Sequence, residues 1–130
     1  MGNFNLMMEN FSDEQFIKES GKLMFLVELL DDLKKNGHKM LVFSRSLKIL
    51  DIINRILINK NWKVARLDGR IKMKDRDTVV RTFQTDKSYS ICLLTSQVGG
   101  VGLTLTAADR VIIYDPSWNP GLIFYFVFYV

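Results

Sequence analysis

The chain has a single cysteine, a single histidine and two prolines among its 130 residues. One cysteine, Cys92, excludes an internal disulfide framework and a zinc site built from several cysteines; in a predicted strand it reads as a core residue. A reducing compartment, the cytosol or the nucleus, fits this cysteine content best. The lone histidine, His38, forms no metal site by itself and is expected in an exposed turn. Two prolines and eight glycines exclude a collagen-like or proline-rich chain.

Long apolar runs are also missing. No run reaches the roughly 18–20 apolar residues that span a bilayer, and residues 1–8 lack the basic segment of a signal peptide. We therefore expect no membrane partner. The composition is 48% hydrophobic and 25% charged, which excludes a disordered chain, and the length fits one domain. The net charge of +4 weakly favours anionic partners such as nucleic acid or phosphate.

Strand and helix patterns alternate along the chain. Short, mainly apolar runs predict strands at residues 40–43, 62–67, 89–94 and 110–114. Apolar residues at helical spacing predict helices at residues 21–35, about 46–58 and 73–84. Because the strands are mainly apolar rather than alternating, they predict an α/β fold whose parallel sheet has helices on both faces.

Three regions differ in character. Residues 1–19 read as an irregular N-terminal tether, and Ser20 is the expected N-cap of the first helix. Asn36 and Gly37 are the expected end of that helix. Residues 20–120 form the predicted domain, and residues 121–130 form an uncharged, apolar tail.

Polar residues directly follow the predicted strands: Ser44-Arg45, Asp68-Gly69, Thr95-Ser96-Gln97 and Asp115. The carboxyl ends of parallel strands share one edge of the sheet, and ligands of such sheets bind there. Hydroxyl and amide groups at that edge can hold a nucleic-acid phosphate. Each group also has a structural alternative, because Ser46 can cap a helix and residues 95–97 can form an ordinary polar turn.

Other motifs carry weaker signals. Residues 99–102 (GGVG) let the backbone approach a phosphate, or simply form a turn. No Walker A loop follows, and the acidic box that holds magnesium is absent. Trp118 stacks on a base or sugar, or anchors its own loop. A basic cluster follows a nucleic-acid backbone or forms a solvated helix start; its members are Arg70, Lys72, Lys74 and Arg76.

Three blocks stand in one order: LVFSRS (residues 41–46), LDG (67–69) and LLTSQVGGVGLTLTAADRVIIYDPSWNP (93–120). They resemble motifs IV, IVa and V of superfamily 2 helicases of the Swi/Snf type, most closely the excision-repair-like subgroup. The resemblance covers residues 19–120. It implies a RecA-like parallel sheet with helices on both faces: a second helicase lobe, incomplete at the C-terminus.

In that family, two RecA-like lobes close over ATP and magnesium and step along duplex DNA. The resemblance implies DNA-binding roles for Ser44, Arg45, Thr95, Ser96 and Trp118. It implies ATP-linked roles for Gly100, Gly102 and Thr104. The implied partners are double-stranded DNA or chromatin and the first RecA-like lobe, and the implied location is the nucleus.

Beyond Pro120 the chain departs from the family pattern. Relatives continue into motif VI, whose arginines reach ATP, whereas residues 121–130 carry no charge. This tail reads as a buried edge strand, or as a truncated or alternatively encoded end. Without a Walker A loop, an acidic box or these arginines, we expect the chain alone to bind no ATP or magnesium and to be catalytically inactive. The alternatives are a non-catalytic DNA- or protein-binding module and an unstable truncated product.

Overall fold

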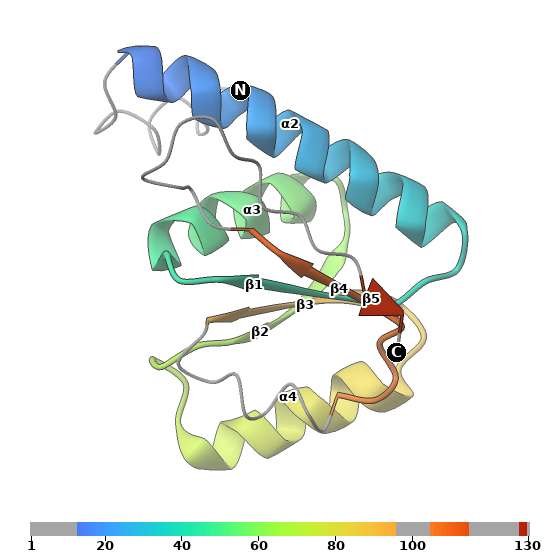
Figure 1. The fold of residues 1–130 in the computed structure, drawn as a ribbon. Coiled ribbons are helices and arrows are strands. Elements are labelled where there is room, and N and C mark those ends of the chain that lie inside the picture. Colours follow the sequence, from blue (N-terminus) through green and yellow to red (C-terminus); the bar gives the residue numbers. More distant parts are fainter. Residues whose placement is uncertain (1–12, 96–104, 115–127, 130) are drawn as a thin grey trace.

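The computed structural model describes residues 13–95, 105–114 and 128–129 (Figure 1). The elements are α2 (Asp13–Lys35), β1 (Met40–Ser44), α3 (Leu47–Asn59), β2 (Lys63–Leu67), α4 (Met73–Thr85), β3 (Tyr89–Thr95), β4 (Arg110–Ile113) and β5 (Phe128–Tyr129). The predicted alternation of strands and helices is confirmed. Each of the four predicted strands matches its observed bounds to within one residue.

The strands form one sheet in the order β2-β3-β1-β4-β5. The first four strands in the chain are parallel, as predicted, and β1 lies between β3 and β4. Strand β5 runs antiparallel to β4, with Phe128 opposite Val111. For these two tail residues, Phe128 and Tyr129, the structure agrees with the edge-strand alternative.

Helices cover both faces of the sheet, as predicted (Figure 1). Successive strand residues point to opposite faces, so Met40 and Val42 pack with α2 and α3 while Leu41 and Phe43 pack on the side of α4. Phe83 of α4 is fully buried on that second side. The buried face of α3 consists of Ile49, Leu50, Ile52, Ile53 and Leu57. The predicted core position of Cys92 is confirmed, and burial raises the pKa of its thiol to about 12.

Helix α2 is longer than the sequence pattern predicted. The prediction of an irregular tether is wrong for residues 13–19, which are helical. The prediction that Ser20 caps this helix is also wrong, because Ser20 lies inside it. The predicted end of the helix is confirmed. Gly37 adopts a left-handed φ of 81°, and the N–H groups of Gly37 and His38 donate to the carbonyls of Lys34 and Leu33, both at 3.0 Å. None of the helices in the described part of the chain has the length and apolarity needed to cross a membrane.

Candidate nucleic-acid interface

The carboxyl edge of the sheet gathers buried polar side chains. Ser44 at the end of β1 lies opposite Thr95 at the end of β3. Asp68 directly follows Leu67, which lies opposite Leu94, so Asp68 shares this edge. Among the residues that the structure describes, these three are the buried polar or charged ones, each 2% exposed. The parallel strands therefore bring Ser44 and Thr95 together at one edge of the sheet, as predicted.

Thr95 has an unpaired hydroxyl. Its Oγ1 is buried and finds no hydrogen-bond partner among the described residues. A buried polar group left without a partner costs about 1–3 kcal/mol. Such a cost is removed when a ligand supplies the missing acceptor, so Thr95 is the strongest sign of a binding site at this edge.

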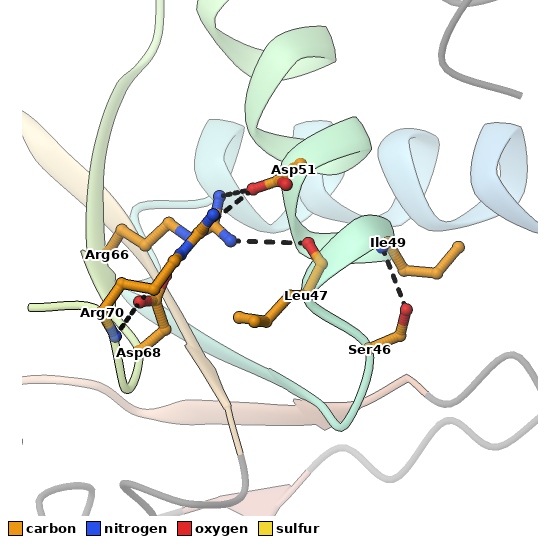
Figure 2. A network of polar contacts seen from close by, with 7 residues as sticks. All are labelled: Ser46, Leu47, Ile49, Asp51, Arg66, Asp68 and Arg70. Carbon is orange, nitrogen blue, oxygen red and sulfur yellow. Dashed lines mark hydrogen bonds and ion pairs between the residues drawn. The ribbon is translucent and has the colours of Figure 1, made fainter.

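The loop between β1 and α3 is ordered by two serines. The Ser46 hydroxyl caps helix α3 by accepting a hydrogen bond from the Ile49 N–H at 3.2 Å (Figure 2). The Ser44 hydroxyl accepts from the Ser46 N–H, also at 3.2 Å. Arg45, between them, is exposed. The positive end of the α3 dipole therefore lies at the carboxyl edge, beside a surface arginine, which favours an anion there.

Four charged residues form a network beside this loop (Figure 2). Arg66 contacts Asp51 of α3 at 2.6 Å and Asp68 at 3.0 Å. Arg70 contacts the same two carboxylates, Asp51 at 3.1 Å and Asp68 at 3.0 Å. The Arg70 backbone N–H also donates to Asp68 at 2.8 Å. The network thus ties the turn after β2 to the first turns of α3.

The network controls the charge state of Asp68. Burial by itself would raise the pKa of this carboxyl, but the hydrogen bonds from Arg70 and the positive charges of Arg66 and Arg70 hold the pKa below its ordinary value of 3.8. The hydrogen bonds that Arg70 donates to Asp68 and Asp51 raise the pKa of the Arg70 guanidinium above its ordinary value. Two guanidinium groups thus face two carboxyl groups in this network.

The remaining predicted site residues are not all within the described part of the chain. Ser44, Arg45 and Thr95 are described and lie at the carboxyl edge. Residues outside the description are Ser96, Gly100, Gly102, Thr104, Asp115 and Trp118. Lys72 and Lys74 are exposed at the start of α4, as the solvated-helix alternative expects.

The opposite, amino edge of the sheet corrects the expectation for His38. His38 is half-buried rather than exposed, and its Nδ1 lies 2.7 Å from a carboxylate oxygen of Asp109. The other oxygen of Asp109 accepts from the Lys39 N–H at 3.1 Å. The Lys39 ammonium donates to the carbonyls of Phe83 and Asp86 near the end of α4. These contacts join the amino edge of the sheet to the end of α4.

The described residues do not fit a magnesium ion. They contain no group of three or more His, Cys, Asp or Glu side chains that could hold a metal. Both acids at the carboxyl edge, Asp51 and Asp68, are already engaged by Arg66 and Arg70.

A groove of about 410 Å³ lies between α2 and α3, away from the strand ends. Leu23 and Val27 of α2 and Ile52 and Ile56 of α3 contribute its apolar lining. Its lining also includes charged residues, and two of these, Asp31 and Lys60, pair with each other at 3.0 Å. We place the candidate site at the carboxyl edge, where the buried hydroxyl of Thr95 lies.

The chain belongs to the helicase conserved C-terminal domain family, whose profile matches residues 21–124. DNA excision repair protein ERCC-6-like of Danio rerio is 54% identical over 115 residues, which is 88% of this chain and 8% of that protein. Chromatin-remodeling ATPase INO80 of Pyricularia oryzae is 46% identical over 111 residues, 85% of this chain and 6% of that protein. The chain thus spans less than a tenth of the length of these relatives.

Solved structures agree with this family. The C-terminal part of the Fun30 ATPase domain matches with a TM-score of 0.70 and 36% identity, over 85% of this chain and 35% of that one. The C-terminal domain of the Sulfolobus solfataricus SWI2/SNF2 ATPase matches with a TM-score of 0.68 and 32% identity, over 85% and 49%. The chain is therefore a Swi/Snf-type C-terminal helicase lobe with a RecA-like sheet.

Proposed function

We propose that this chain binds the backbone of duplex DNA as the second RecA-like lobe of an ATP-dependent translocase. The observation that carries the proposal is the buried, unpartnered hydroxyl of Thr95 opposite Ser44. Thr95 Oγ1 donates to a phosphate oxygen, and Arg45 with the N-terminus of α3 supplies positive potential. Because these groups lie at the ends of rigid β-strands, a movement of the lobe also moves the DNA strand that it binds.

The site further includes residues outside the described part of the chain. Ser96 and Trp118 extend the DNA contacts, and Gly100, Gly102 and Thr104 link them to the nucleotide. The names of the relatives, a DNA excision repair protein and a chromatin-remodeling ATPase, support duplex DNA or chromatin as the partner and the nucleus as the location. ATP and magnesium are held chiefly by a first lobe, which supplies the Walker A loop and the acids that this sequence lacks.

The test is the affinity of the 130-residue chain for a labelled duplex of mixed sequence, measured by fluorescence anisotropy over a range of salt. We expect affinity to fall steeply as salt rises, because phosphate contacts release counterions. Thr95→Val removes the hydroxyl and keeps the shape, so it weakens binding; Thr95→Ser keeps the hydroxyl and retains binding. The thermal melt of Thr95→Val is expected to be unchanged or higher, because the variant deletes an unsatisfied buried group.

A charge-matched pair provides the control. Arg45→Ala lowers the slope of log Kd against log salt by about one, the contribution of one phosphate contact. Lys87→Ala removes the same charge before β3, at the amino edge, and leaves the slope unchanged. Equal effects of the two variants, or no binding at low salt, would overturn the proposal. DNA-stimulated ATP turnover by the chain alone would contradict the assignment of ATP chemistry to a first lobe.

A further inference from the structure

Arg70 is held in one orientation at the carboxyl edge. Its Nε and Nη2 donate to the two oxygens of Asp68, at 3.3 and 3.0 Å, and Nη2 also donates to Asp51 at 3.1 Å (Figure 2). These contacts engage the Nε and Nη2 atoms of the planar guanidinium. The side chain as a whole remains 56% exposed. Charge-assisted hydrogen bonds are strong and directional, so three of them fix the orientation of this partly exposed side chain.

The free side of this guanidinium suits a phosphate. The contacts within the described residues use Nε and Nη2, so the two N–H donors of Nη1 remain for a ligand. Arg66 balances part of the charge of Asp51 and Asp68, so Arg70 is not their only cation. Because the side chain is ordered before the ligand arrives, little conformational entropy is lost on binding.

We propose that Arg70 is a further phosphate-binding residue of this edge, with Asp68 as the positioning residue that orients it. The inference rests on the proposed DNA binding and extends the contact surface from the ends of β1 and β3 to the turn after β2. The ligand group is a backbone phosphate, whose oxygen accepts from the N–H donors of Arg70 Nη1.

The experiment compares Arg70→Ala with Arg81→Ala in the same anisotropy titrations. Arg81 is an exposed arginine farther along α4, so the two variants lose equal charge. We expect Arg70→Ala to lower the salt slope by about one and Arg81→Ala to leave it unchanged. Arg70→Lys keeps the positive charge but loses the planar guanidinium that Asp68 and Asp51 orient. We expect this variant to keep the salt slope of the unaltered chain while binding DNA more weakly.

The outcomes separate this inference from the proposed function. If Arg45→Ala and Thr95→Val weaken binding while Arg70→Ala behaves like Arg81→Ala, the role of Arg70 is wrong and the DNA site stands. If the unaltered chain does not bind duplex DNA, the proposed function itself fails. Thermal melts of every variant, measured beside the titrations, restrict the comparison to folded protein; should Arg70→Ala unfold, Arg70→Lys decides the question by its affinity.

Discussion

The buried polar residues of the described chain are few, and all of them share one edge. Ser44, Asp68 and Thr95 end or follow three neighbouring parallel strands. Burial of apolar side chains stabilises the core without these three residues. Burying each of their polar groups costs free energy, because the group loses its hydrogen bonds to water. Ser44 and Asp68 offset that cost by hydrogen bonds within the chain, whereas Thr95 has no such partner among the described residues.

At this scale Asp68→Asn is expected to lower the free energy of unfolding by about 1.5–3 kcal/mol near neutral pH, because hydrogen bonds to a charged group are lost. The pKa of Asp68 in the folded state lies below the unfolded value of 3.8. The ionised carboxyl group therefore stabilises the fold fully above about pH 5. This stabilisation is lost as the pH falls below 3.8 and through the folded-state pKa. The loss of stability in acid should therefore be shallower in Asp68→Asn.

Urea denaturation at several pH values measures this difference. Asp77→Asn, on the exposed face of α4, is the charge-matched control and should not reproduce the change. Some acid sensitivity should survive in Asp68→Asn, because hydrogen bonds also hold the pKa values of Asp86 and Asp109 low. An identical pH profile for Asp68→Asn and the unaltered chain would contradict the role given to the network.

Single residues were harder to predict than elements. Ser46 was a foreseeable cap, because its hydroxyl bonds a neighbour three positions away. The position of Asp68 after a strand was also foreseeable, but its pairing with Asp51 and the arginines was not, because nothing in the local sequence joins α3 to that turn. His38 was misjudged for the same reason: its partner, Asp109, lies 71 positions along the chain.

At the scale of elements, α2 belongs to the folded lobe. Leu23, Leu26 and Leu30 on one side of it are buried in the core shared with α3 and the sheet. Strand positions were predictable because short, mainly apolar runs bounded by polar residues and turn residues are typical of buried strands. The first turns of α2 were missed because residues 13–19 are mostly polar, and helical residues of that kind carry no apolar stripe to reveal them.

Two substitutions in α2 test this packing. Leu26→Ala, at a fully buried position, is expected to cost about 2–5 kcal/mol of unfolding free energy, the range for deleting a core side chain. Met24→Ala, at a position 65% exposed, should change stability by no more than about 0.5 kcal/mol. Chemical denaturation measures both. Similar effects of the two would mean that α2 does not pack as described.

At the scale of the whole molecule, the two edges of the sheet differ in how their polar groups are paired. The amino edge is closed by contacts of His38, Lys39 and Asp109 that satisfy one another and the end of α4. At the carboxyl edge the Thr95 hydroxyl is buried without a partner among residues 13–95 and 105–114, and Arg45 and Arg70 are exposed. The parallel fold class and the strand positions followed from the pattern of apolar runs, whereas the order of the strands in the sheet did not.

The most direct test of this division is to map duplex DNA onto the chain by amide chemical shifts in solution, at low salt. The account predicts the largest changes at residues 44–46, 68–70 and 95, with little change at residues 38–39 and 109–110. The largest changes at the amino edge or along the groove between α2 and α3, with none at residues 44–46 and 95, would contradict it.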